Sequence, residues 1–162
     1  MSGYDSSHLS QADSGKTSRT RNFIETLFSR KDDWDNAFPE ALADDLVWIT
    51  NGSSPISGRY ESKQAYADRV LKPMHEIVER IPAPTVKHIF ADGLWAVVHW
   101  RCEGVKAKNG ASYEQDYCWL IRTNGHPENK IVEIISWFDP AKLSLAMEGT
   151  SVTFPGAQSK IE

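Results

Sequence analysis

Two tyrosines in the second half of the sequence, Tyr113 and Tyr117, carry the side chains best suited to acid–base chemistry. They lie four residues apart in a run typical of a strand, so both point to one face, about 13 Å apart along it. A phenol can donate a hydrogen bond to a developing oxyanion, and beside a carboxylate it can relay a proton. The spacing therefore predicts either two hydroxyls for the oxygen atoms of a ligand or two core residues with satisfied hydroxyls.

Four other side chains could move the proton: Asp116, Glu133, His99 and His75. Strand alternation favours an outer face for Asp116, away from the two tyrosines, where it would meet a dimer partner or an arginine such as Arg101; the alternative is that it is one of the few acids of a pocket. Histidine is a natural acid or base near neutral pH. The register that turns Trp100 inward turns His99 outward, however, which favours a dimer contact. Glu133 has the same ambiguity as Asp116, and His75 could face a cavity from its helix.

Aromatic residues are unusually frequent, with six Trp, six Phe and five Tyr in 162 residues. Trp48, Trp100, Trp119 and Phe138 would give a cavity flat apolar walls suited to an aromatic or terpenoid ligand. The alternative is an aromatic core without a cavity. Trp95 and Trp137 fall on the opposite strand face by alternation, and exposed aromatic residues are typical of a dimer interface.

The elements that position these residues follow from hydrophobic periodicity. Helices are predicted over residues 22–28, 34–44 and 66–81, the last with a kink at Pro73. Strands are predicted over residues 46–50, 86–91, 94–103, 113–122 and 131–138, separated by Gly- and Asn-containing turns. Because consecutive strands with short turns run antiparallel, we expect an α+β fold in which helices cover one face of a curved sheet.

The chain divides into three parts by composition. Residues 1–18 hold six Ser and few apolar residues, which predicts a disordered lead. Residues 19–147 have the length of one domain, because two domains would each be too small for a good core. Residues 148–162 form a short polar tail that is either loose or lies over a cavity mouth.

The same composition argues against several classes of function. The formal net charge is −4 and no basic run exists, so nucleic acid is not an expected partner. No apolar run reaches the roughly 18 residues of a membrane span, and the N-terminus lacks the apolar centre of a signal peptide, so a cytoplasmic protein is expected. Two cysteines without zinc-ligand spacing, and no phosphate loop, GxSxG or HExxH motif, predict neither metal nor cofactor.

Three segments resemble the SnoaL-like branch of the nuclear-transport-factor-two-like superfamily. They are Trp48-Ile-Thr-Asn-Gly52 with Ser57-Gly58-Arg-Tyr60 and Lys63, then Asn109-Gly110 with Tyr113-Glu-Gln-Asp-Tyr117-Cys-Trp119 and Arg122, then Lys130-Ile-Val-Glu133 with Trp137-Phe138-Asp139. The resemblance covers roughly residues 20–145. It implies a cone-shaped α+β barrel around one deep pocket, in a homodimer formed across the outer face of the sheet. It also implies that Tyr113, Gln115, Tyr117 and Trp119 face the pocket.

The resemblance argues against two mechanisms found in this superfamily, although it implies the pocket that hosts them. The ketosteroid isomerases place their general base near Ile49 and their oxyanion-hole acid near Trp119, and neither residue here can hold a proton in that role. The SnoaL-type aldol cyclases place a catalytic Asp where this sequence has Ser136. The chain is more similar to fungal SnoaL-like tailoring isomerases and cyclases, whose pockets combine tyrosines with carboxylates.

These observations predict a cofactor-independent isomerase or cyclase acting on a polycyclic small molecule of secondary metabolism, by rearrangement, cyclisation or dehydration. The alternative is a non-catalytic dimeric protein of the same fold that binds a hydrophobic ligand or acts as an accessory protein. The predicted catalytic residues are Tyr113, Tyr117, Asp116, Glu133 and His99. The predicted substrate-binding residues are Trp48, Asn51, His75, Trp100, Gln115, Trp119, Ser136 and Phe138.

Overall fold

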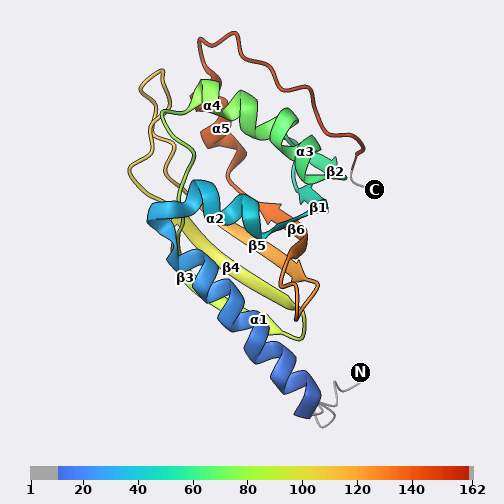
Figure 1. Ribbon diagram of the computed structural model, residues 1–162. Coiled ribbons are helices and arrows are strands. Elements are labelled where there is room, and N and C mark those ends of the chain that lie inside the picture. Colours follow the sequence, from blue (N-terminus) through green and yellow to red (C-terminus); the bar gives the residue numbers. More distant parts are fainter. Residues whose placement is uncertain (1–10, 161–162) are drawn as a thin grey trace, which may run out of the picture.

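The computed structural model describes residues 11–160, and within them six strands form one mixed sheet in the order β2-β1-β6-β5-β4-β3 (Figure 1). The strands are β1 (Leu42–Thr50), β2 (Gly58–Tyr60), β3 (Thr85–Asp92), β4 (Trp95–Cys102), β5 (Gln115–Thr123) and β6 (Ile131–Trp137). Neighbouring strands are antiparallel except β1 and β6, which run parallel. The expected α+β class and the β3–β6 meander are confirmed, in a curved sheet that is open, with β2 and β3 at its edges.

The helices lie on one side of this sheet (Figure 1). They are α1 (Gln11–Ser29), the 3₁₀ turn η2 (Lys31–Asp33), α2 (Trp34–Ala41), α3 (Lys63–Tyr66), the π-helical turn η3 (Ala67–Leu71), α4 (Lys72–Ile77) and α5 (Pro140–Met147). Side chains fix two of the helix starts: Ser62 accepts from the Ala65 N–H, and Asp139 accepts from the Ala141 N–H. The apolar spacing of α2 works as expected, because Trp34, Phe38 and Ala41 are buried on one face.

Several boundaries differ from the expectations: the strand expected from residue 113 begins at Gln115, the helices expected to residues 44 and 81 end at Ala41 and Ile77, and α1 is extended by a tertiary contact. Residues 11–18 of the expected disordered lead belong to α1, while residues 1–10 lie outside the described residues. The side chain of Thr17 accepts from the Gly93 N–H at 2.8 Å, and that of Thr20 donates to the Gly93 carbonyl at 2.7 Å. These bonds anchor α1 to the β3–β4 turn. Composition alone does not reveal such an anchor.

Other differences concern elements next to the site. The strand expected from residue 46 begins at Leu42, and the expected long helix consists of α3, η3 and α4, with Pro73 in the first turn of α4. The short strand β2 and the helix α5 were not expected. Both depend on partners far along the chain: Tyr60 pairs with Trp48 in the sheet, and α5 buries Leu143.

The C-terminal tail, described as far as residue 160, packs against the rest of the domain. It passes from α5 along α4 and α3 to the edge at β2, where Ser159 pairs with Arg59 (Figure 1). Arg69 of η3 donates to the Gly156 carbonyl at 2.9 Å. Gly58 is required at the crossing, because a Cβ there would lie 2.3 Å from the Cβ of Ala157 and the residue has a φ of +132°.

The two faces of the sheet differ in character. On β4 the residues Ala96, Val98 and Trp100 are buried under the helices, whereas the alternate residues His99 and Arg101 are only half buried on the outer face. No helix within residues 11–160 is both long and apolar enough to cross a membrane.

Candidate functional site

A cavity of about 320 Å³ lies between the covered face of the sheet and the helices α2, η3 and α4. Its size is about twice that of the ~150 Å³ apolar cavity known to hold one benzene ring. The residues that line it are Trp34, Asp35, Phe38, Pro39, Trp48, Thr50, Ile56, Tyr66, Val70, Leu71, Met74, His75, Ile81, Pro82, Trp100, Tyr113, Tyr117, Trp119, Ser136 and Phe138. Eight of the thirteen residues expected in the site are therefore brought together here: Trp48, His75, Trp100, Tyr113, Tyr117, Trp119, Ser136 and Phe138.

Stacked aromatic rings form the cavity walls. The rings of Trp100 and Tyr117 stack at 4.1 Å between centroids with planes 9° apart, and those of Trp48 and Tyr66 stack at 3.9 Å and 11°. Trp119 lies between the two stacks and contacts Trp48 and Trp100 edge to face, at 5.2 and 5.0 Å. Such packing holds flat apolar surfaces in fixed positions, which suits a flat apolar ligand.

Tyr113 and Tyr117 are two of the three tyrosines that line this cavity, the third being Tyr66. Burial raises the pKa of Tyr113 to about 12. Burial, followed by the charge that Tyr113 would carry, raises the pKa of Tyr117 well above its ordinary value. Both phenols are therefore neutral at physiological pH, so they act as hydrogen-bond donors or acids and not as bases.

A second polar group lies on the strands β1 and β6. The indole N–H of Trp48 donates to the Ser136 hydroxyl at 3.2 Å. The Ser136 hydroxyl has one proton, which can go to the Ile49 carbonyl at 3.2 Å or to the Thr50 hydroxyl at 3.3 Å. Because these groups satisfy one another, they contribute a polar patch to the wall without an unpaired donor.

Two ionisable side chains, Asp35 of α2 and His75 of α4, line the cavity from exposed positions at its mouth. They are the only Asp, Glu, His, Lys or Arg side chains among the lining residues of the described chain. Sequence reasoning identified His75 but missed Asp35. A signal existed, because Asp35 directly follows Trp34 at the start of a helix whose apolar face was recognised. The other missed residues, such as Tyr66, Val70 and Met74, lie in the segment expected as a helix over residues 66–81.

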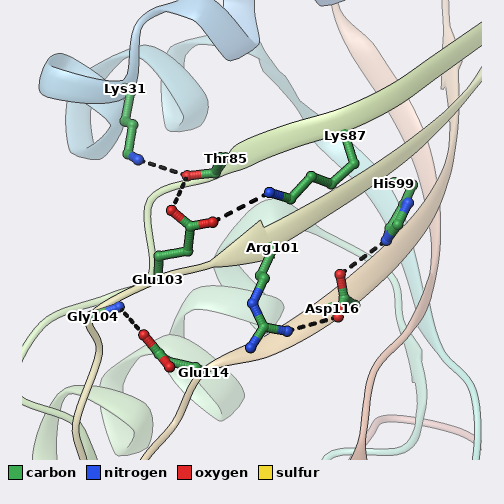
Figure 2. Close-up of polar contacts among 9 residues, drawn as sticks. All are labelled: Lys31, Thr85, Lys87, His99, Arg101, Glu103, Gly104, Glu114 and Asp116. Atoms are coloured by element: carbon green, nitrogen blue, oxygen red, sulfur yellow. Dashed lines mark hydrogen bonds and ion pairs between the residues drawn. The ribbon is translucent and has the colours of Figure 1, made fainter.

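Two of the expected catalytic residues, Asp116 and His99, lie on the outer face of the sheet and not in the cavity. Figure 2 shows Asp116 between His99, whose Nε2 is 3.0 Å away, and Arg101, whose guanidinium is 2.8 Å away. These hydrogen bonds, the one from His99 first, hold the pKa of Asp116 below its ordinary value. Strand alternation explains the placement, since Trp100 and Tyr117 beside them point inward. Exposed ion pairs of this kind contribute little to stability.

Three further expected site residues lie outside the cavity wall. Glu133 pairs with Arg122 at 3.0 Å across β5 and β6. Asn51 is hydrogen-bonded to the main chain of Ser136 at the end of β1. Gln115 faces inward but is buried behind the wall, where its side-chain oxygen accepts from the Asp139 N–H at 2.9 Å. None of the three is among the residues that line the cavity.

No group of three or more His, Cys, Asp or Glu side chains within residues 11–160 is arranged to hold a metal ion. The free thiol of Cys102 donates to the Tyr113 carbonyl at 3.0 Å, and burial raises its pKa. It is therefore protonated and engaged with the backbone of Tyr113, just before β5.

Comparisons with solved structures support the fold. The chain is similar to an NTF2-like protein from Burkholderia thailandensis, with a TM-score of 0.65 and 17% identity over 80% of this chain and 98% of that one. It is similar to an LEH-like epoxide hydrolase from M. tuberculosis, with a TM-score of 0.57 and 18% identity over 80% and 90% of the two chains. A candidate isomerase from Bacillus subtilis matches with a TM-score of 0.57 and 22% identity over 86% and 97%.

Curated proteins give no significant match to this chain. The family model described as the SnoaL-like domain matches residues 20–134, which include the helices α2 to α4 and most of the sheet. This match confirms the resemblance noted in the three sequence segments. The chain therefore belongs to the SnoaL-like domain family.

Proposed function

We propose that this protein is a cofactor-independent isomerase or cyclase of secondary metabolism that acts on a neutral, oxygen-bearing polycyclic compound. The observation that carries the proposal is a pair of neutral phenols, Tyr113 and Tyr117, facing an aromatic cavity. Two ionisable groups, Asp35 and His75, line the same cavity at its mouth. A donor for an oxyanion and a group that can accept a proton are the two requirements of enolisation.

The substrate class follows from the cavity. A volume of about 320 Å³ accommodates roughly two or three fused rings, by comparison with the one-ring cavity above. The inner wall carries tryptophan, tyrosine and aliphatic side chains, and the ionisable residues of the described lining are confined to the mouth. A charged group in the interior would lose its hydration without gaining a partner, so the substrate is expected to be neutral there.

The chemistry would be a proton transfer next to a carbonyl group. Asp35 or His75 would remove a proton from carbon, and the electron pair of the C–H bond would form the enolate. The enolate oxygen would accept a hydrogen bond from Tyr113, and the proton would return at another position to give the isomer. In a cyclase, the same enolate carbon would attack an electrophilic carbon of the same molecule.

A second candidate function is the binding of a hydrophobic ligand without chemistry. The apolar character of most of the lining favours it, as does the exposure of Asp35 and His75 to solvent. The two candidates differ in one observable property. A binding protein slows the exchange of a bound ketone's α-protons with solvent or leaves it unchanged, whereas an enolising enzyme accelerates this exchange.

The test is the exchange of 2-tetralone in deuterated buffer, followed by proton NMR. This neutral ketone has two fused rings, and its benzylic α-protons are acidic enough to report enolisation. We expect the protein to accelerate their exchange above the buffer rate with saturation kinetics. Saturable binding without acceleration would support the ligand-binding protein instead, and no binding at all would overturn both candidates.

Asp116→Asn provides a control on the outer face of the sheet. Asp116 contacts His99 and Arg101 and is separated from the cavity by the sheet, so the exchange rate is expected to stay within twofold of wild type. If the exchange rate fell as much as in a variant of a cavity residue, the carboxylate of Asp116 would again be a candidate catalytic group.

We also propose that the protein is a homodimer joined through the outer face of the sheet. An apolar row crosses this face in register, formed by Ile49, Ile135, Leu120, Val97 and Phe90. Phe90 is 63% exposed, and the nearby Trp137 is 45% exposed. Exposed aromatic residues next to an apolar row are typical of an interface core.

Phe90→Glu is expected to convert the dimer to monomers, because it would place two carboxylates in an apolar contact. The molar mass from sedimentation or light scattering, measured over a range of concentrations, checks this prediction. Leu145→Glu is the matched control, since Leu145 is 46% exposed on α5, away from the outer face. A wild-type protein that stays monomeric at every concentration would contradict the proposed dimer.

A further inference from the structure

Two tryptophans, Trp48 and Trp100, have similar places in the cavity wall and differ in one respect. Each lines the cavity, each is 2% exposed, and each stacks flat on a tyrosine, Trp48 on Tyr66 and Trp100 on Tyr117. The indole N–H of Trp48 donates to the Ser136 hydroxyl at 3.2 Å. The indole N–H of Trp100 is buried and has no hydrogen-bond partner within residues 11–160.

The unpaired N–H of Trp100 needs an explanation, because native proteins pair nearly all of their buried donors. A buried donor without an acceptor has lost its hydrogen bond to water and gained none in return. One other buried donor of the described chain lacks a partner, the side-chain amide of Gln115, but Gln115 does not line the cavity. Trp100 therefore supplies the unpaired buried donor that belongs to the cavity wall of the described chain.

The packing of Trp100 holds its ring in place without giving its N–H an acceptor. Tyr117 lies flat against one face of the ring, with 4.1 Å between centroids and 9° between planes. Trp119 contacts the same ring at 5.0 Å with its plane 80° away. An indole N–H lies in the plane of its ring, so the stacked phenol lies above this donor and not in front of it. A donor fixed in this way loses little freedom when it meets an acceptor.

The acceptor that suits this donor is a neutral oxygen atom. An indole N–H is a donor only, so its partner has to offer a lone pair. The described lining contains no Lys or Arg, so a carboxylate or phosphate in the interior would lose its hydration without meeting a counter-charge. A carbonyl oxygen on an apolar ring system fits both conditions. It has two lone pairs, so a contact with Trp100 leaves one for a second donor such as Tyr113.

We propose that the indole N–H of Trp100 anchors a carbonyl oxygen of the ligand and selects ketones over hydrocarbons of the same shape. The inference rests on the proposed function for the class of ligand, and it applies to an enzyme and to a binding protein alike. It gives the two tryptophans different roles. Trp100 recognises the oxygen atom, whereas Trp48 contributes apolar surface alone, because its N–H is already engaged.

The test compares the binding of two ligands that differ by one carbonyl oxygen, 2-tetralone and tetralin. Their dissociation constants are measured by isothermal titration calorimetry on the wild-type protein, Trp100→Phe and Trp48→Phe. Both substitutions replace an indole by a smaller ring and enlarge the cavity, but only Trp100→Phe removes an unpaired N–H. The ratio of the two dissociation constants cancels the effect of the lost volume, because both ligands experience it.

We expect Trp100→Phe to weaken the binding of 2-tetralone about three- to tenfold relative to that of tetralin, which corresponds to the loss of one neutral hydrogen bond. Trp48→Phe is the matched control: the affinity for both ligands is expected to fall alike, so the ratio stays within about twofold of wild type. An unchanged ratio in Trp100→Phe would overturn the inference, and so would an equal change of the ratio in both variants.

A measurement on the wild-type protein keeps the test decisive if Trp100→Phe does not fold. The indole N–H groups are observed by NMR of protein labelled with nitrogen-15, and that of Trp100 is assigned through its contacts with the ring of Tyr117. We expect 2-tetralone to move the Trp100 N–H proton resonance downfield, as a new hydrogen bond does, and tetralin to leave it upfield. If the ketone does not cause this shift, whether it binds elsewhere or not at all, the inference is wrong.

The exchange of 2-tetralone in deuterated buffer separates this result from the proposed reaction. If the ketone shifts the Trp100 resonance but its α-protons are not exchanged faster than in buffer, the proposed reaction is wrong and the anchoring role stands. If exchange is accelerated while the Trp100 resonance does not respond to the ketone, the reaction stands and the anchoring role is refuted.

Discussion

Tyr113→Phe is expected to slow the exchange of 2-tetralone about 100-fold or more, the range seen when one oxyanion donor is removed from an active site. The side chain of Tyr113 is 2% exposed and lines the cavity, so no water can replace the missing hydroxyl without entering an apolar space. The affinity for the neutral ketone should change much less, because most of the contact with the ligand comes from the aromatic walls. The loss should therefore appear in the rate at saturation.

Tyr60→Phe is the matched control for this prediction. Tyr60 is a fully buried tyrosine that donates to the Ile56 carbonyl at 2.8 Å, and it does not line the cavity. Its loss is expected to reduce stability and to leave the exchange rate of the folded protein unchanged. Equal exchange rates for Tyr113→Phe and the wild-type protein would contradict the donor role of Tyr113.

The pH profile gives an independent check on the same residue. Burial raises the pKa of Tyr113 to about 12, so its O–H is present throughout the neutral and mildly alkaline range. The donor contribution is therefore retained as pH rises and is lost only as the pH approaches the raised pKa. We expect no loss of rate from this group up to about pH 10, near the ordinary pKa of a tyrosine.

Trp119→Ala is expected to have the largest effect on stability, a loss of about 3–5 kcal/mol in the free energy of unfolding. The ring of Trp119 is 6% exposed and contacts the rings of Phe28, Phe38, Trp48, Trp100 and Tyr117. It thereby joins α1, α2, β1 and β4 at one point. Removing it would merge its own volume with the existing cavity, and a space of that size cannot close by small movements of its walls.

Chemical denaturation followed by far-ultraviolet circular dichroism measures this loss. Trp119→Phe serves as the comparison, since it keeps an aromatic ring in contact with α2 and β4 and should cost roughly 1–2 kcal/mol. For a domain whose total stability is of the order of 5–15 kcal/mol, the alanine variant is expected to be partly unfolded near physiological temperature. A cost below about 1 kcal/mol would show that the rings around Trp119 can collapse on each other.

The candidate site was partly predictable because strand alternation is a local property. The period of two along residues 113–119 is enough to place Tyr113, Tyr117 and Trp119 on one face and Asp116 on the other, whatever the strand packs against. The same period separates Trp100 from His99. The helix over residues 66–81 was predicted as well, although the role of Tyr66, Val70 and Met74 as a cavity wall was not.

Other features of the fold and of the candidate site could not be predicted, because they depend on contacts between distant segments. Local spacing cannot show that Asp35 of α2 and His75 of α4 line one cavity, since forty residues separate them in sequence. It cannot show that the side-chain oxygen of Gln115 is occupied by the Asp139 N–H, which removes Gln115 from the ligand contacts. The helical residues 11–18 belong to the same group, because Thr17 and Thr20 anchor them to Gly93.

The fold class and the residues that share a face could be predicted from the sequence, because hydrophobic period and turn chemistry act over a few residues at a time. The position of the cavity opening and the pairing of the polar groups could be seen only once the chain was folded. These properties depend on the packing of whole elements. A polar side chain is available to a ligand only if no other segment of the folded chain already pairs with it.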